Sequence, residues 1–288
     1  MAITRRSFLA GSAAGLAGLA LARDLGAAEA APAPPRLRIG ARHFGYDLER
    51  AKRAGMDGVE LCEGRAADRL HVADPAVREK AKAQMKTTGV AVSSICIDFL
   101  NGNPVATDAR GVAWLLQAIE AAGDLGAAAI LVPFFGGTSS LVANRQLKRE
   151  AVDALVPRLK EVAPKAKEAK VVLGLENTCS AEQNLEILDR VASDAVGVYY
   201  DIGNSTGAGY DVPVEIRALK GRIAMFHFKD GNAYLGEGRV RMEPVAEAIK
   251  AIEYQGWIVL ETGNPSKDPV ADCKRNGDYI RKLLGIAG

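Results

Sequence analysis

The chain has 288 residues, of which 25% are charged and 48% hydrophobic, and its formal net charge is +2. This composition is typical of an ordinary soluble globular protein, and a chain of roughly 250 residues buries enough surface to fold without disulfides or a structural metal. No cluster of lysine and arginine is interleaved with aromatic residues, so nucleic acid is not an expected partner.

The first thirty residues have the pattern of an export signal. The segment TRRSFL at 4–9 resembles a twin-arginine signal, an apolar stretch follows at 9–22, and AEA at 28–30 fits a cleavage site. The apolar stretch is shorter than the roughly 20 residues that cross a bilayer. We therefore predict a signal peptide at 1–30, a linker at 31–36 and a folded domain at 37–288. An uncleaved anchor and a chance alanine-rich start are the alternatives.

This signal predicts that the twin-arginine export machinery is a partner. The protein is then expected in the periplasm or otherwise exported, with no stable membrane span after cleavage. Because sugar phosphates are mainly cytoplasmic metabolites, an exported enzyme of sugar chemistry is expected to act on a non-phosphorylated substrate.

From residue 37 onward, short apolar segments alternate with amphipathic segments rich in Ala, Lys and Glu. We expect strands at 37–41, 58–62, 91–97, 127–134, 171–176, 197–201, 223–228 and 257–261. We expect helices at 48–54, 75–87, 109–124, 146–168, 181–191, 213–220, 244–252 and 268–284. The strand segments are apolar on both faces, as in buried parallel sheets.

Eight βα units in about 250 residues predict an α/β protein with a (β/α)8 TIM barrel. The competing fold is a doubly wound open sheet, which usually carries a glycine-rich nucleotide turn. The glycines at 123–126 and 136–137 do not form the GxGxxG pattern after the first strand.

Four successive predicted strands end in ionisable residues, which are Glu176, Asp201, His227 and Glu261. In a barrel of this type the chemistry lies where the strands end, so these side chains are expected to converge at the mouth. A charge at the end of a buried strand is costly unless it is paired or bound to a metal. Three converging carboxylates therefore predict one divalent metal ion, and mixed oxygen and nitrogen ligation favours Mn²⁺, with Mg²⁺, Co²⁺ or Zn²⁺ as alternatives.

The strand ends GLEN, YDIGN, HFKD and LET, in this order, resemble the xylose-isomerase-like superfamily, in particular its ketose 3-epimerase, hydroxypyruvate isomerase and inosose dehydratase branch. The resemblance covers essentially the whole chain after residue 36. It implies that Glu176, Asp201, His227 and Glu261 are the metal ligands, and that Glu176 and Glu261 are also the catalytic acid/base pair. The chain departs from the family in having Asn204 where a histidine is common, and in having no arginine after His227 before Arg239.

Such a site removes a proton next to a carbonyl to give an enediolate, which a bound metal stabilises. The expected function is a sugar isomerase or epimerase that acts on a non-phosphorylated keto-sugar. Two alternatives stay open: a lyase or dehydratase of a keto-glycoside or keto-inositol that uses the same site, and a non-catalytic exported sugar-binding protein.

Five further residues are candidate substrate contacts. They are Glu60, which is expected to point into the barrel; Lys229, which shares the phase of His227; Asn204; His43, which follows the first strand; and Arg239. The alternative, purely structural roles are a buried ion pair for Glu60, a salt bridge for Lys229 and a helix cap for His43. The outer face of a barrel could also support a homo-oligomer.

Overall fold

The computed structural model describes residues 37–286, which belong to one compact unit. The predicted signal peptide at 1–30 and linker at 31–36 lie outside the described residues. Within the described part of the chain, no helix is both long and apolar enough to cross a membrane.

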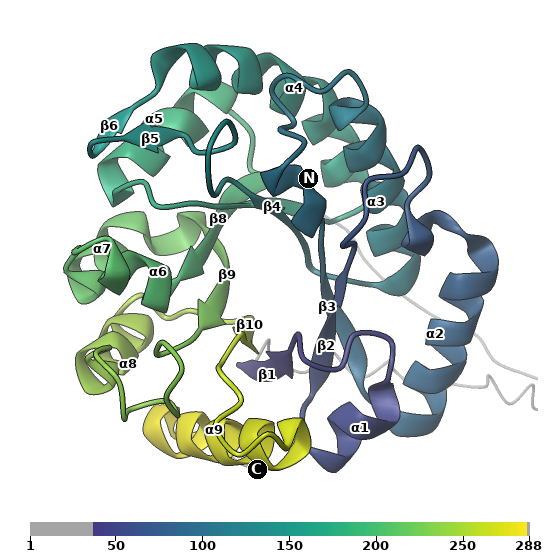
Figure 1. The fold of residues 1–288 in the computed structure, drawn as a ribbon, viewed down its shortest axis with the longest axis vertical. Coiled ribbons are helices and arrows are strands. Elements are labelled where there is room, and N and C mark those ends of the chain that lie inside the picture. Colours follow the sequence, from purple (N-terminus) through teal and green to yellow (C-terminus); the bar gives the residue numbers. More distant parts are fainter. Residues whose placement is uncertain (1–36, 287–288) are drawn as a thin grey trace, which may run out of the picture. The chain divides into compact units, whose positions relative to one another are not determined.

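Eight parallel strands of the described chain close into a barrel in the order β1-β10-β9-β8-β7-β4-β3-β2, and helices surround them (Figure 1). The barrel strands are β1 (Arg38–Ala41), β2 (Gly58–Cys62), β3 (Ala91–Cys96), β4 (Ala129–Pro133), β7 (Val172–Glu176), β8 (Val196–Asp201), β9 (Ile223–Phe228) and β10 (Trp257–Leu260). Every neighbouring pair in the barrel is parallel, including the closing pair of β1 and β2. The predicted (β/α)8 barrel is confirmed, with strand bounds within two residues of those expected.

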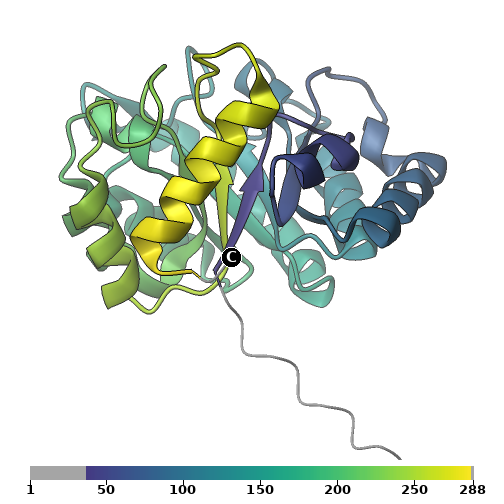
Figure 2. The same ribbon diagram turned by 90° about the horizontal axis from the view of Figure 1, so that it is seen from below.

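The helices lie on the outside of the barrel, and the side view shows α9 packed along it (Figure 2). Their bounds are α1 (Leu48–Arg53), α2 (Pro75–Thr88), α3 (Gly111–Leu125), α4 (Arg149–Glu168), α5 (Ala181–Val191), α6 (Ile202–Gly207), α7 (Val212–Leu219), α8 (Met242–Ala251) and α9 (Pro269–Leu284). Short 3-10 helices cover His71–Ala73, Asp98–Asn101 and Lys220–Arg222.

Local sequence signals explain where these helices begin and end. Asp74 caps α2 by accepting from the Ala76 backbone N–H, with Pro75 in the first turn. Ser180 and Gln183 form a reciprocal capping box at the start of α5. At its other end, α2 stops at Gly89, whose φ of 76° suits glycine.

One predicted helix start is wrong. The segment 146–168 was expected to be helical throughout, but Gln146–Leu147 forms strand β6, which pairs antiparallel with β5 (Val142–Ala143). The two residues between these strands, Asn144 and Arg145, have φ of 50° and 63°. Positive φ at both central positions is the geometry of a tight hairpin turn, so the chain turns back before α4 begins.

The inside of the barrel is filled by side chains below the mouth. This layer consists of Cys96, Ala129, Leu131, Tyr199, Met225, Trp257 and Val259. Gly58 makes room for the indole of Trp257, because a Cβ at Gly58 would lie 2.5 Å from Cη2 of the ring. This apolar layer lies beneath the polar residues of the mouth and packs against them from inside the barrel.

We expect Gly58→Ala to lower the free energy of unfolding by about 1–3 kcal/mol, because the added methyl group overpacks the barrel interior. The matched control is Gly64→Ala, since a Cβ at the exposed Gly64 meets nothing within 4 Å and surface changes are usually within about 0.5 kcal/mol. Urea denaturation of the three proteins checks this. Equal stabilities for the two variants would contradict the packing explanation.

Candidate active site

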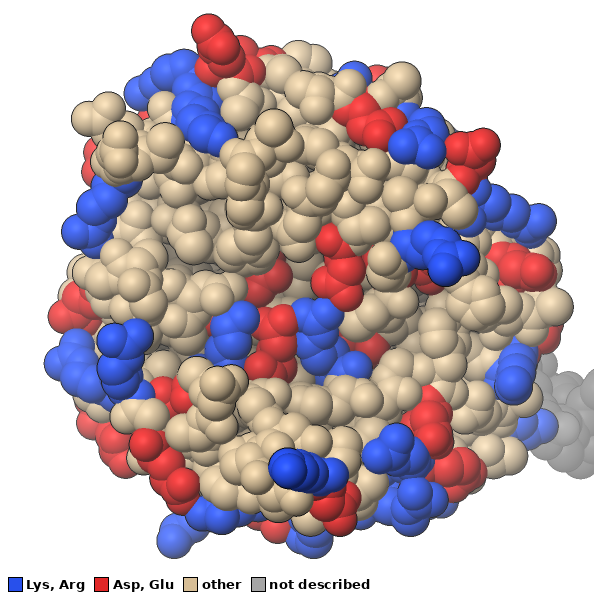
Figure 3. All heavy atoms as spheres, viewed as in Figure 1, with Lys and Arg blue, Asp and Glu red and all other residues tan. Residues whose placement is uncertain are grey.

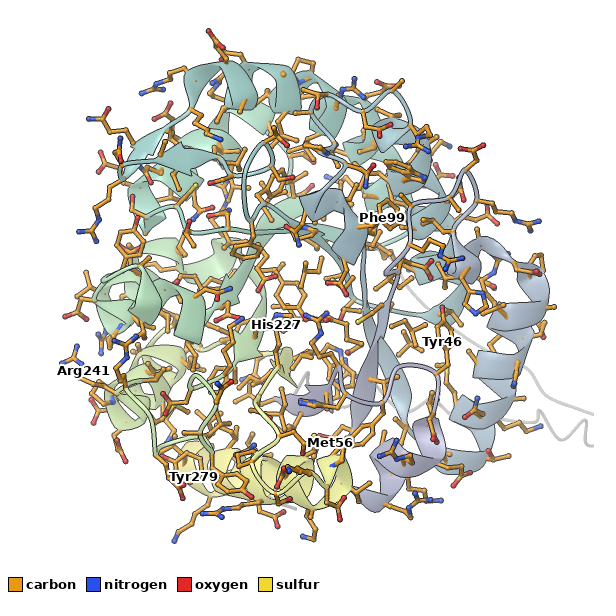
Figure 4. The ribbon with its side chains drawn as sticks, viewed as in Figure 1. Tyr46, Met56, Phe99, His227, Arg241 and Tyr279 are labelled. Carbon is orange, nitrogen blue, oxygen red and sulfur yellow. The ribbon has the colours of Figure 1, made fainter. Side chains whose placement is uncertain are left out.

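The four predicted strand-end residues lie together at the carboxyl edge of the barrel. Glu176 ends β7, Asp201 ends β8, His227 is the penultimate residue of β9, and Glu261 directly follows β10. Asp201 and His227 are register partners on neighbouring strands. Seen along the barrel axis, His227 lies at the centre of the molecule (Figure 4).

The imidazole of His227 faces the three carboxylates with one nitrogen. Its Nδ1 atom lies 3.0 Å from Glu176 Oε1, 3.3 Å from Glu261 Oε2 and 4.0 Å from Asp201 Oδ2. One donor atom from each of the four residues lies within 4.8 Å of the other three. The four side chains thus surround one point, as expected from the order of the strands.

The electrostatics of this cluster fit a divalent cation. Asp201 is 2% exposed, and its Oδ2 atom accepts no hydrogen bond although Lys229 Nζ lies 3.0 Å away. Burial, together with the nearby charge of Glu176, raises the pKa of Asp201 to about 7. A buried carboxylate oxygen that accepts no hydrogen bond is expensive, and a set of three carboxylates and one imidazole is a suitable ligand set for Mn²⁺, Mg²⁺ or Zn²⁺.

Two cations flank Glu261, one on each oxygen. Lys229 Nζ lies 2.7 Å from Oε2, and the guanidinium of Arg42 pairs with Oε1. Although burial opposes ionisation, the hydrogen bond to His227 and the charges of Lys229 and Arg42 hold the pKa of Glu261 far below its usual value. Glu261 is therefore a fixed anion in the metal-free protein.

Sequence reasoning missed Arg42 and its partner Asp98. Arg42 directly follows β1, and its Nη2 atom lies 2.8 Å from Asp98 Oδ2. Asp98 begins the 3-10 helix that follows β3. Both residues obey the rule that polar side chains after barrel strands reach the mouth, so examining the ends of the first and third strands as closely as the last four would have found them.

The mouth contains a cavity of about 160 Å³. Its lining residues are Arg42, Asp98, Asn101, Pro133, Phe135, Glu176, Asn204, Lys229 and Glu261. Figure 3 shows acidic and basic side chains gathered in the hollow at the centre of this face. A larger cavity of about 660 Å³ lies near the start of β8 and β9, away from this cluster.

The predicted substrate contacts fall into two groups. Lys229 and Asn204 line the cavity beside the four clustered residues. Glu60, His43 and Arg239 are not among the lining residues: Glu60 is fully buried below His227, His43 Nε2 lies 2.8 Å from the backbone oxygen of Thr262, and Arg239 is exposed in the loop after β9. Substrate contact by these three residues stays a prediction.

Fold and site together define a (β/α)8 barrel with a carboxylate–histidine centre suited to a divalent metal at the carboxyl ends of its strands. The chain belongs to the family described as xylose isomerase-like TIM barrel, whose family model matches residues 48–283. This finding confirms the superfamily that the strand ends resemble.

Individual relatives agree with this assignment. The chain is 28% identical over 261 residues to an Escherichia coli L-ribulose-5-phosphate 3-epimerase, a match that covers 84% of this chain and 90% of the relative. The structure of an L-ribulose 3-epimerase superposes with a TM-score of 0.71 at 24% identity, covering 86% of this chain and 95% of the other. A zinc-bound IOLI protein superposes with a TM-score of 0.64 at 15% identity, covering 86% and 98%. The E. coli relative is named an epimerase, and the chain is accordingly an enzyme of the isomerase class.

Proposed function

We propose that this protein is a divalent-metal-dependent epimerase or isomerase of a non-phosphorylated keto-sugar, with Mn²⁺ as the preferred ion. The observation that carries the proposal is the convergence of Glu176, Asp201, His227 and Glu261 on one point beside a small polar cavity. When bound there, the metal would act as a Lewis acid that stabilises negative charge on the carbonyl and hydroxyl oxygens of the substrate.

The protein's own groups supply the proton transfers. Glu176 and Glu261 both line the cavity and come from strands β7 and β10, on either side of β8 and β9 in the barrel. One of the two, as the carboxylate, removes a proton next to the carbonyl, and the other, as the protonated carboxylic acid, returns a proton from the opposite face. Lys229, with its ammonium group 2.7 Å from Glu261, places a positive charge where the enediolate develops.

The size and charge of the cavity favour a small substrate without a phosphate. Its volume of about 160 Å³ is well below the roughly 300–1,000 Å³ of pockets for drug-sized ligands. The two cations among its lining residues are already paired, Arg42 with Asp98 and Glu261, and Lys229 with Asp201 and Glu261. A phosphate would have to displace these carboxylates, so we propose a free keto-sugar rather than a phosphorylated one like that in the name of the E. coli relative.

Export is a second part of the proposal. The twin-arginine pattern at 4–9 supports passage of the folded, metal-loaded enzyme through the twin-arginine machinery into the periplasm. An exported enzyme meets free sugars rather than sugar phosphates, in agreement with the charge balance of the cavity.

Solvent-deuterium exchange tests the reaction. The protein with Mn²⁺ is incubated in D₂O with a panel of free ketoses, 3-keto-glycosides and L-ribulose 5-phosphate, and NMR and mass spectrometry are used to analyse the products. We expect deuterium to enter next to the carbonyl of a non-phosphorylated keto-sugar, with loss of exchange in Glu176→Gln.

Each other result has a defined meaning. Faster exchange with the sugar phosphate would contradict the proposed substrate class. Loss of water from the product would identify elimination, as in a lyase or dehydratase, in place of epimerisation. Stoichiometric metal binding without exchange on any substrate would favour a sugar-binding role.

A further inference from the structure

A buried carboxylate occupies the side of His227 that faces away from the cavity. Glu60 belongs to β2, is 0% exposed, and places its Oε1 atom 3.2 Å from His227 Nε2. Its other oxygen, Oε2, accepts hydrogen bonds of 2.8 Å from the hydroxyl groups of Tyr199 and Ser94. Both oxygens of Glu60 are thus engaged inside the barrel.

The hydrogen-bond partners of Glu60 are as buried as Glu60 itself, and the partly exposed Arg42 lies farther off, with its Nε atom 3.9 Å from Glu60 Oε1. Tyr199, Ser94 and His227 are all 0% exposed and come from three other strands, β8, β3 and β9. The ring of Tyr199 also packs against the imidazole edge to face, with centroids 4.5 Å apart. One tyrosine therefore holds both the carboxylate and the imidazole, which leaves little freedom for either group to turn.

This arrangement determines which nitrogen of His227 can bind a metal. A neutral imidazole carries one hydrogen, and the nitrogen without it is the ligand. Ionised Glu60 only accepts hydrogen bonds, so it stabilises the hydrogen on Nε2 and leaves the Nδ1 lone pair facing Glu176, Asp201 and Glu261. Without Glu60, the hydrogen would favour Nδ1, where Glu176 Oε1 lies 3.0 Å away, and it would block the ligand position.

We propose that Glu60 is a positioning residue for the metal site, which selects the Nε2–H tautomer of His227 and thereby directs Nδ1 at the ion. This inference rests on the proposed function, because it concerns the same centre. It assigns Glu60 a role other than the substrate contact expected from sequence. Carboxylates that orient metal-binding histidines in this way typically contribute 10–100-fold to metal affinity.

The test compares two buried glutamates of the same region by their effect on metal affinity in the absence of substrate. Glu60→Gln keeps the shape but removes the charge, and we expect about 10–100-fold weaker Mn²⁺ binding by calorimetry or chelator competition. Glu63→Gln is the matched control. Glu63 is 4% exposed, but it accepts hydrogen bonds from the His71 and Val72 backbone N–H groups and does not contact His227. We expect its metal affinity to equal that of the wild type.

A second readout follows the tautomer itself. The chain has three histidines, so ¹⁵N-histidine NMR of the Zn²⁺-loaded protein can assign His227, and we expect hydrogen on Nε2 in the wild type. If Glu60→Gln does not fold, Tyr199→Phe, which removes one donor to Glu60, should still weaken metal binding several-fold.

The outcomes separate this inference from the proposed function. A wild-type protein that binds no divalent metal overturns the metal site and the positioning role together. Tight metal binding by the wild type and equally by Glu60→Gln, or hydrogen on Nδ1, overturns the positioning role alone. Unchanged metal affinity with a raised KM would identify Glu60 as a substrate contact instead.

Discussion

Replacing Asp201 by asparagine is expected to weaken divalent-metal binding at least about 100-fold and to abolish turnover. Asp201 directs an oxygen without a hydrogen bond at the cluster, so the variant removes a charge that is available to a cation. Asparagine still offers an oxygen to the backbone N–H of Asn204, which Asp201 Oδ1 caps at 2.7 Å. Because this cap can survive, the fold is expected to persist. Calorimetric titration with Mn²⁺ measures the loss.

Asp98→Asn is the matched control for this variant. Asp98 is also a carboxylate that lines the cavity, but it pairs with Arg42 and is not one of the four clustered residues. We expect its metal affinity to stay within a few-fold of the wild type. If both variants bound metal as tightly as the wild type, the ligand set would be wrong. If both lost it, the effect would be one of total charge at the mouth rather than of ligation.

The second large effect is a loss of stability of the metal-free protein as pH rises from about 4 to about 7. The folded-state pKa of Asp201 is raised to about 7 from a usual value of 3.8, so folded Asp201 retains a proton that the unfolded chain has released. Its contribution to stability is full below about pH 4 and is lost as pH rises through 7. At about 1.4 kcal/mol per pKa unit, the loss is on the order of 2–4 kcal/mol.

Two histidines also change the stability in this pH range, so the quantity to measure is the difference in free energy of unfolding between the wild type and a variant at Asp201. Although burial opposes it, the charges of Glu60 and Glu176 raise the pKa of His227, which adds a loss of the same sign. Burial lowers the pKa of His43, which acts in the opposite direction below pH 6.5. Urea denaturation of wild type and Asp201→Asn at each pH isolates the contribution of Asp201.

We expect the free energy of unfolding of the metal-free protein to depend less on pH in the Asp201→Asn variant than in the wild type. A saturating divalent ion at pH 8 should restore the stability of the wild type by about 2.7 kcal/mol at a hundred times its Kd. Parallel pH profiles of the two metal-free proteins would contradict the raised pKa of Asp201.

The four clustered residues at the strand ends could be predicted from the sequence alone. Glu176, Asp201, His227 and Glu261 stand at the ends of four successive apolar segments that have the pattern of buried parallel strands. Parallel strands have their carboxyl ends at one edge, so any polar residue at that place in the chain reaches the mouth. Their convergence within 4.8 Å therefore followed from order and periodicity alone.

The roles of the interior residues were decided by tertiary structure. Sequence phase placed Glu60 inside the barrel correctly, but it did not show whether the side chain points to the cavity or to His227, a residue 167 positions away. The hairpin of β5 and β6 was not predicted from the sequence either. Gln146 and Leu147 have no β signal strong enough to oppose the helical pattern that follows them.

The sequence by itself therefore determined the (β/α)8 fold and the four residues that surround the centre, because hydrophobic periodicity and strand polarity act locally and repeat in every βα unit. Only the tertiary structure decided that Arg42 and Lys229 neutralise Glu261 from both sides and that Glu60 lies behind His227. These contacts depend on the rotamers and packing of side chains from strands far apart in the chain. No local pattern in the sequence encodes them.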